Sequence, residues 1–192
     1  MRATTPLREL LLGIRQRRTG LAAALIACLI GAQAGAAAAP LELAVKAAYL
    51  AKFAPFVVWP AGAFRGPSAP LVLCVQGDDP FDGMLDRLTE GQSVGAHPIV
   101  VRRTQRLDAE SGCQIAYLAG SPTQSQTAAL KAVEGQPVLT VTDAESDGAA
   151  RGIVHLVLIG GRVRFVIDEG KAGQSRLEIS SKLLALAAEV KR

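Results

Sequence analysis

The sequence has very few of the side chains on which enzymes depend for acid–base and metal chemistry. Its 192 residues include only two histidines, His97 and His155. His155 alternates with Val154 and Leu156 in a strand-like segment, which favours a structural role over catalysis. The Gly-x-Ser-x-Gly, phosphate-binding glycine-rich and His-Glu-x-x-His motifs are absent, and no residues have metal-ligand spacing. We therefore expect no catalytic residues, no metal site and no cofactor.

The chain also lacks an excess of charge once its first 18 residues are set apart. The formal net charge is +4, from 21 basic and 17 acidic residues. Five arginines and one glutamate lie within residues 1–18, and removing them leaves 16 basic and 16 acidic residues. The rest of the protein is formally neutral, so its high isoelectric point does not indicate a nucleic-acid partner.

The N-terminal segment has the features of an export signal. An arginine-rich stretch ends at Arg18, and the apolar run "LAAALIACLIGA" and a small-residue stretch follow. The Ala-Gly-Ala at 34–36 fits the A-x-A rule, so we expect residues 1–38 to be a cleavable signal peptide, cut between Ala34 and Ala38. The apolar run is short for about 30 Å of hydrocarbon, which disfavours a transmembrane anchor. We expect an exported mature protein.

Two other export signals fit this segment less well. Arg17-Arg18 could begin a twin-arginine signal, but the Thr-Gly-Leu that follows matches that pattern poorly. Leu25–Cys28 fits a lipoprotein box, but apolar residues continue past Cys28 and only about seven precede it. Both alternatives are therefore less favoured than a cleaved secretory signal.

Cysteine is scarce, and its distribution agrees with export. Of three cysteines, Cys28 leaves with the predicted signal, and Cys74 and Cys113 remain. An even pair in an oxidising compartment indicates a disulfide, although two separately buried thiols are the alternative. A bond between them would close a loop of about 40 residues, worth about 4 kcal/mol in the chain-entropy model.

No repeat, charge block or linker divides residues 39–192, which we interpret as one domain. Residues 41–56 carry apolar side chains at helical spacing, and Pro60 should end this helix. Four apolar runs are predicted as strands, at 70–77, 97–104, 113–120 and 136–143.

Two segments between these strands have the signals of helices. Asp79 is a plausible N-cap, with Pro80 at the first helical position and Gly91 past the end. In the second segment Ser121 is the expected cap, Pro122 lies inside the helix, and Gly135 stops it.

The C-terminal part has a different pattern. Gly160-Gly161 joins two β-branched runs and predicts a hairpin over residues 152–168. A terminal helix should follow, with Ser180 or Ser181 as cap and an apolar stripe at Leu183, Leu186, Ala187 and Val190. The predicted fold class is α/β: a mostly parallel sheet flanked by helices on both faces, with a C-terminal β-hairpin and a terminal helix.

Two motifs at opposite ends of the chain resemble the YfiR/HmsC-like family of small exported proteins. The first is an aromatic-rich helix that runs into Trp-Pro, here with Phe53, Phe56, Trp59 and Pro60. The second is "LEISSKLL", after the predicted hairpin. The order of the intervening segments also matches, so the resemblance covers essentially the whole mature chain.

The resemblance implies a fold, an activity and partners. It implies an α/β sandwich that can form a homodimer. It also implies a periplasmic, non-enzymatic regulator that binds the sensor domain of an inner-membrane diguanylate cyclase and inhibits it, lowering cyclic di-GMP and biofilm output. Three departures stand out: Arg151-Gly152 where relatives often have Gly-Gly, Asp168 where many have Asn, and no second cysteine pair before the hairpin.

Two sets of residues are candidates for function. Apolar aromatic surface marks interfaces, so the candidate partner-binding residues are Phe53, Phe56, Val57 and Trp59. Burial in the core is the alternative for this set. Ligand sites gather at the carboxyl ends of parallel strands, and basic side chains bind anions. The candidate ligand-binding residues are Asp78, Asp79, Arg164, Asp168 and Arg176, for which turns, caps and solvated strand faces are the alternative.

The competing functional hypothesis is a periplasmic small-molecule-binding module without a cyclase partner. Its cleft would lie near Asp78, Asp79 and Arg176. The chain is short for a two-lobed solute receptor, which argues against transport. A hydrolase ranks third.

Overall fold

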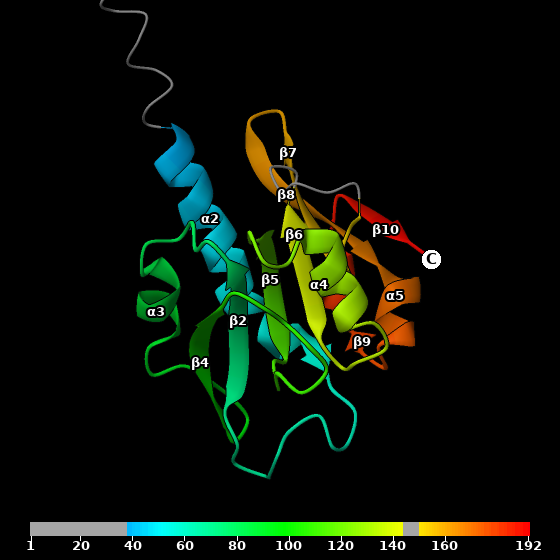
Figure 1. Cartoon of the computed structure of the whole chain (residues 1–192). Coiled ribbons are helices and arrows are strands. Elements are labelled where there is room, and N and C mark those ends of the chain that lie inside the picture. Colours follow the sequence, from blue (N-terminus) through cyan, green and yellow to red (C-terminus); the bar gives the residue numbers. More distant parts are fainter. Residues whose placement is uncertain (1–37, 144–149) are drawn as a thin grey trace, which may run out of the picture. The chain divides into compact units, whose positions relative to one another are not determined.

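An eight-stranded, mostly parallel sheet organises the protein (Figure 1). The structure is a computed structural model that describes residues 38–143 and 150–192. In chain order the elements are α2 (Ala38–Phe53), the 3₁₀ turn η1 (Ala54–Phe56), β1 (Val57–Val58), β2 (Leu71–Gly77), α3 (Met84–Thr89), β3 (Ser93–Val94), β4 (His97–Thr104), β5 (Ile115–Gly120), α4 (Gln126–Ala132), β6 (Leu139–Asp143), β7 (Val154–Ile159), β8 (Arg162–Asp168), α5 (Glu169–Gln174), β9 (Glu178–Ile179), α6 (Ser181–Leu184) and β10 (Glu189–Lys191).

The strand order of the large sheet is β10-β8-β7-β6-β5-β2-β4-β3. Strands β4, β2, β5, β6 and β7 run parallel to one another, and β3 pairs antiparallel with β4 at the edge. Strand β8 turns back antiparallel to β7, and β10 runs parallel to β8. The predicted α/β fold with a mostly parallel sheet is confirmed, and so is the hairpin, whose Gly160 and Gly161 both have positive φ.

Side chains of one central strand alternate between two hydrophobic clusters, one on each face of the sheet. Leu73 and Val75 of β2 face the larger cluster, together with Leu50 of α2 and Leu85 of α3. Cys74 faces the smaller cluster, to which α4 contributes three apolar side chains, namely Ala129, Leu130 and, at its end, Val133. Helices therefore cover both faces, as predicted.

Helix α2 ends earlier than predicted, because a proline other than Pro60 breaks it. The helix stops at Phe53, and Pro55 lies in the first turn of η1. Proline has no N–H to donate to the carbonyl four residues before it, so the α-helical ladder ends there. The chain then extends into β1 before it reaches Pro60.

Both internal helices begin later than predicted. Asp79 accepts a hydrogen bond from the Phe81 amide, and the helix proper starts after Gly83, whose φ is 69°. The cap of α4 is Ser125, which accepts from the Ala128 amide, rather than Ser121. Each predicted cap instead lies in a turn that precedes the helix. Short polar side chains accept the same backbone hydrogen bonds in turns as they do in helix caps.

The C-terminal segment keeps its predicted cap but not its predicted length. Ser180 caps α6, which is a single turn ending at Leu184. Residues Glu189–Lys191 then form β10 and extend the sheet beside β8, so the predicted stripe to Val190 is not helical. Helix α5, which Asp168 caps through the Lys171 amide, was not predicted.

The predicted signal peptide lies outside the described residues, apart from Ala38. Among the residues that the structure does describe, no helix has the length and apolar character needed to cross a membrane. Residues Glu42–Arg192 form one compact unit, and the single-domain boundary at residue 39 stays a prediction.

Candidate functional site

The carboxylates after β2 are already occupied by an arginine from the neighbouring strand. Arg103 of β4 donates from Nε to Asp79 Oδ2 at 2.8 Å and from a terminal nitrogen to Asp86 Oδ1 at 2.9 Å. Asp79 also accepts the Phe81 amide, while Asp78 is exposed beside it. This arrangement fixes the turn between β2 and α3 and leaves little of Asp79 for a ligand.

Asp86 provides a pH-dependent test of this ion pair. The hydrogen bond from Arg103 holds the pKa of Asp86 below its ordinary value. Both side chains are substantially exposed, so Asp86→Asn should lower the free energy of unfolding at pH 7 by no more than about 1 kcal/mol. A depressed carboxyl pKa stabilises the fold above the unfolded value and loses that contribution as the pH falls through the folded value.

The expected result is therefore a difference between wild type and Asp86→Asn that is constant near neutral pH. It should shrink as the pH falls below the ordinary aspartate pKa of 3.8, and vanish once Asp86 is protonated in the folded protein. Urea titrations at several pH values would measure it. Asp82→Asn is the matched control, because Asp82 is exposed and has no ion pair among the described residues. If Asp82→Asn changed the free energy of unfolding with the same pH dependence, the effect could not be assigned to the Arg103–Asp86 ion pair.

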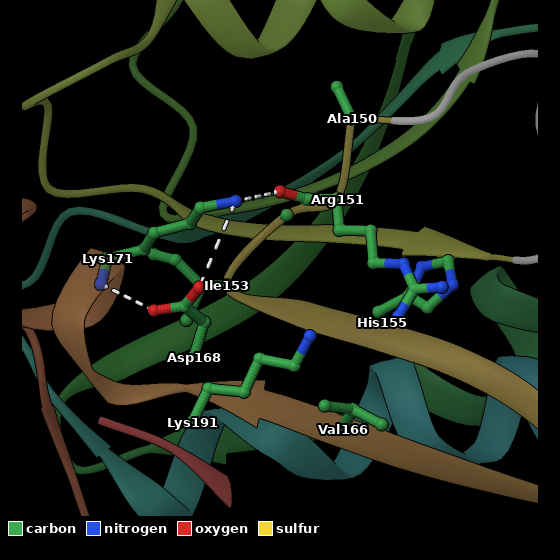
Figure 2. A pocket seen from close by; sticks show the side chains of 9 residues that line it. Ala150, Arg151, Ile153, His155, Val166, Asp168, Lys171 and Lys191 are labelled. Carbon is green, nitrogen blue, oxygen red and sulfur yellow. Dashed lines mark hydrogen bonds and ion pairs between the residues drawn. The ribbon is translucent and has the colours of Figure 1, made fainter. Parts of the chain in front are cut away.

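The other candidate ligand residues lie apart from this turn and from one another. Asp168 lines a cavity between β7, β8 and α5 (Figure 2). Arg164 lies beside the tip of the hairpin, in a depression that also includes Arg162. Arg176 borders a third hollow near Trp59, and its backbone has a φ of 57°. The structure therefore does not bring the predicted ligand set together.

Cys74 and Cys113 form a disulfide, which confirms the predicted pairing over the alternative of two free thiols. The S–S distance is 2.00 Å, and the Cα atoms are 5.9 Å apart. Cys74 lies inside β2, and Cys113 directly precedes β5, its parallel neighbour. Both sulfur atoms are buried in the smaller cluster, so the bond fixes the entry of β5 to the centre of the sheet.

The sequence analysis missed a buried charge cluster at the end of β6. Lys46 of α2 lies 3.0 Å from Asp143 and 2.6 Å from Glu42. The Tyr117 hydroxyl donates to the same carboxylate of Asp143 at 2.7 Å. The sequence signal that could have revealed this cluster is Lys46, a lysine among the apolar residues of the first helix. Such pairs are costly to break, so this cluster fixes α2 over the carboxyl ends of the central strands.

Two segments from opposite ends of the chain meet in a separate two-stranded sheet. Val57 and Val58 of β1 pair antiparallel with Ile179 and Glu178 of β9. The Ser180 amide adds a hydrogen bond to the Phe56 carbonyl at 2.9 Å. The aromatic segment after α2 therefore forms a short strand that pairs with the C-terminal segment.

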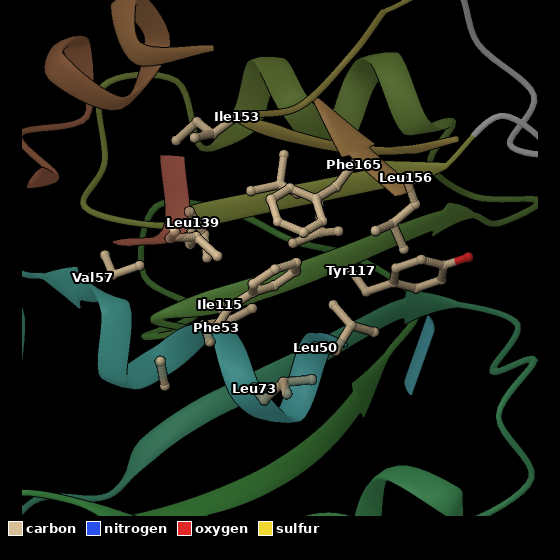
Figure 3. Close-up of a cluster of buried hydrophobic side chains, with 14 of the residues drawn as sticks. Leu50, Phe53, Val57, Leu73, Ile115, Tyr117, Leu139, Ile153, Leu156 and Phe165 are labelled. Atoms are coloured by element: carbon tan, nitrogen blue, oxygen red, sulfur yellow. The ribbon is translucent and has the colours of Figure 1, made fainter. Parts of the chain in front are cut away.

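The four candidate partner-binding residues divide between core and surface. Phe53 and Val57 are buried in the larger cluster (Figure 3), where the Phe53 ring meets the edge of Phe165. They present no side-chain surface to a partner. Phe56 and Trp59 are half-buried, and the Trp59 indole donates to the Gln114 carbonyl at 3.3 Å. Phe53 and Val57 therefore lie in the core, which was the alternative for these candidates.

A surface remains beside these residues. A cavity of about 400 Å³ lies between β1 and the segment that follows α5. Val58, next to it, is 60% exposed. We call this region the corner surface, lined by Val58, Trp59, Pro60, Arg176, Leu177 and Glu178. It combines apolar side chains with one cation and one anion, which is the composition of a protein-binding patch.

Comparison with known families gives one match that covers most of the chain. The model of the family described as YfiR/HmsC-like matches residues 43–188. No curated protein matches the sequence significantly. The matched range includes both strands of the small sheet, β1 and β9, and both cysteines of the disulfide.

Proposed function

The chain belongs to the YfiR/HmsC-like family, and from this premise we propose that it is a periplasmic regulator of an inner-membrane diguanylate cyclase. It would bind the periplasmic sensor domain of the cyclase and inhibit the enzyme, which lowers cyclic di-GMP and biofilm output. The observation that supports this proposal most is the meeting of the two characteristic end motifs at the corner surface.

Inhibition without catalysis requires differential binding. The protein can shift the cyclase toward its inactive state only if it binds that state of the sensor domain more tightly. The described residues contain no group of three or more His, Cys, Asp or Glu side chains that could hold a metal ion. We assign the proposed inhibition to surface contacts, because differential binding needs no catalytic group, and the signal peptide would deliver those contacts to the periplasm.

The corner surface is the contact region that we propose. The Val58 side chain projects from a short strand, β1, that pairs with β9 and is followed by Pro60. Tryptophan and arginine are enriched among the residues that dominate binding energy in interfaces, and Trp59 and Arg176 both border this exposed apolar side chain. Arg176 and Glu178 would then supply polar contacts at the rim.

Val58→Asp tests this assignment. A carboxylate placed in a desolvated interface should weaken binding of the purified sensor domain at least about tenfold. The side chain is exposed, so the loss of folding free energy should stay within about 1 kcal/mol, the repulsion expected from Glu178 opposite it in β9. Leu158→Asp is the matched control: Leu158 is 54% exposed, compared with 60% for Val58, and lies in β7 near the hairpin tip. Surface plasmon resonance with both variants would measure the difference. Equal binding by wild type and Val58→Asp would remove the corner surface from the proposal.

Homodimer formation is part of the same proposal, and light scattering on the mature protein tests it.

The second candidate function, a small-molecule-binding module without a cyclase partner, was expected to have a cleft near Asp78, Asp79 and Arg176. Asp79 instead binds Arg103, and Arg176 borders the corner surface. A thermal-shift screen with a metabolite panel would decide it, because a bound ligand raises the melting temperature.

A further inference from the structure

A cleft with one basic end and one apolar end lies on the face of the sheet that α4 covers. The basic end is a cavity of about 520 Å³ lined by Arg151, His155, Asp168, Lys171 and Lys191 (Figure 2). The other end, which we call the apolar end, is a cavity of about 260 Å³ between α4 and α5. Its apolar lining residues are Leu130, Val133 and Ile153, and its charged ones are Lys131, Glu134, Arg151 and Lys171. Arg151, Ile153 and Lys171 border both cavities, so the two ends adjoin one another.

The basic end has more positive charge than its own residues neutralise. Among the described residues that line it, Asp168 is the one carboxylate, and its Oδ1 accepts the Lys171 amide at 2.9 Å as a helix cap. The Lys171 ammonium donates to the Arg151 carbonyl at 2.6 Å and lies 3.9 Å from Asp168. Within residues 38–143 and 150–192, neither the Arg151 guanidinium nor the Lys191 ammonium has an acidic partner. Two cations are therefore available to an anion.

His155 forms the floor of this end and has a fixed orientation. Its side chain is 6% exposed, and Nδ1 lies 3.0 Å from the Thr142 hydroxyl. That hydroxyl already accepts the Gly152 amide at 3.0 Å. Because Thr142 is fully buried, its own hydrogen needs an acceptor, and Nδ1 is the one in reach. The imidazole proton then resides on Nε2.

The Nε2–H group has no acceptor in the described part of the chain. Burial is the main cause that lowers the pKa of His155, and the charge of Arg151 acts in the same direction, as does the smaller effect of Lys191, while Asp143 opposes them. The ring is therefore neutral and offers one N–H donor to the cavity. Nε2 is accessible from the cavity and is not sealed in the core, so a bound anion can accept its N–H.

The backbone around this floor cannot easily move. A Cβ atom on Gly152 would lie 2.6 Å from the Thr140 carbonyl oxygen, so the segment before β7 packs directly on β6. The Ile153 amide donates to the Thr140 hydroxyl at 3.0 Å. The cleft thus has a preorganised wall, which reduces the entropic cost of binding.

We propose that this cleft binds a small organic anion. Its phosphate or carboxylate group would contact Arg151, Lys191 and the Nε2–H of His155, and its apolar part would occupy the end lined by Leu130, Val133 and Ile153. A cavity of about 150 Å³ holds a benzene molecule, so the apolar end accommodates one ring system rather than the chains of a membrane lipid. The site does not depend on the proposed inhibition of a cyclase.

Calorimetry on the mature protein tests the proposal with phenyl phosphate, inorganic phosphate and benzyl alcohol as probes. Phenyl phosphate should bind saturably and at least about tenfold more tightly than either of the others, because only it fills both ends. Arg151→Gln and Lys191→Gln should each weaken it about tenfold. Leu130→Ser should weaken phenyl phosphate without changing inorganic phosphate.

Lys182→Gln is the matched control, since Lys182 is an exposed lysine of α6 outside the cleft. Histidine NMR on the wild-type protein gives a second readout that no variant can compromise. The Nε2 resonance of His155 should shift with phenyl phosphate. The resonances of His97, a residue of β4 that is stacked on Phe64, should not shift. Absence of saturable binding, equal loss in Lys182→Gln, or equal shifts of both histidines would overturn the site. Sensor-domain binding by these variants should be unchanged.

Discussion

Gly77→Ala should prevent folding or lower the free energy of unfolding by at least about 3 kcal/mol. Gly77 is the last residue of β2, and its φ is 91°. A Cβ atom there would lie 1.8 Å from the Gly120 carbonyl oxygen of β5. The strands cannot separate to relieve this clash, because the buried Gln76 side chain accepts the Gly120 amide and donates to the carbonyls of Gln105 and Gln124.

Gly135→Ala is the control that separates steric conflict from backbone strain. Gly135 also has a positive φ, 70°, but a Cβ atom there would meet nothing within 4 Å. It should cost about 1–2 kcal/mol, the price of a left-handed conformation for an L-residue. Urea unfolding followed through Trp59, the one tryptophan of the chain, measures both. Equal losses for the two variants would mean that β2 and β5 do not approach as closely as described.

Loss of the Cys74–Cys113 bond should cost about 4 kcal/mol. The cysteines are 39 residues apart, and a loop of that length restricts the unfolded chain by roughly this free energy. The variant Cys74→Ala/Cys113→Ala should therefore unfold at much lower urea concentration than the oxidised wild type. Two alanines are preferable to one substitution, which would leave an unpaired thiol in the smaller cluster.

Reduction supplies the internal control for this experiment. Reductant should move the wild-type transition to that of the double variant, and it should not move the double variant. A loss of less than about 1 kcal/mol would contradict the entropic account of this disulfide. If the reduced protein stays folded and still binds its partner, the bond is a structural crosslink and not a switch.

The sequence predicted the large sheet well because its strands carry continuous apolar runs. The segments at 97–104 and 113–120 became β4 and β5 within two residues at either end. Gly160-Gly161 predicted the hairpin because two consecutive positive φ angles are costly for other residues. These signals are local, and the disulfide followed from the small number of cysteines.

The misplaced elements depend on contacts that are distant in sequence. Strand β1 exists because β9, more than 100 residues later, pairs with it, and two valines alone do not indicate a strand. Strand β10 likewise depends on the open edge of β8, so Val190 joined a sheet instead of the expected helix. The candidate ligand residues were dispersed for the same reason, because their common position required a topology that the sequence pattern leaves open.

The cleft at His155 could not be found from local patterns either. Arg151, Lys171 and Lys191 belong to a loop, a helix and a strand that meet only in the folded chain. The alternation of Val154, His155 and Leu156 correctly placed the histidine in a strand and favoured a structural role. It gave no sign that Thr142 would fix one nitrogen and leave the other facing a cavity.

The most direct test of the central proposal is a pull-down from membranes with the mature protein, in oxidised and in reduced form. We expect that the protein recovers a membrane diguanylate cyclase through its periplasmic domain, and that Val58→Asp recovers less of it than Leu158→Asp. Recovery with the oxidised form alone would add a role for Cys74–Cys113 in holding the binding-competent shape. Recovery of no cyclase under either condition would contradict the proposed inhibition and leave the small-molecule-binding module as the leading function.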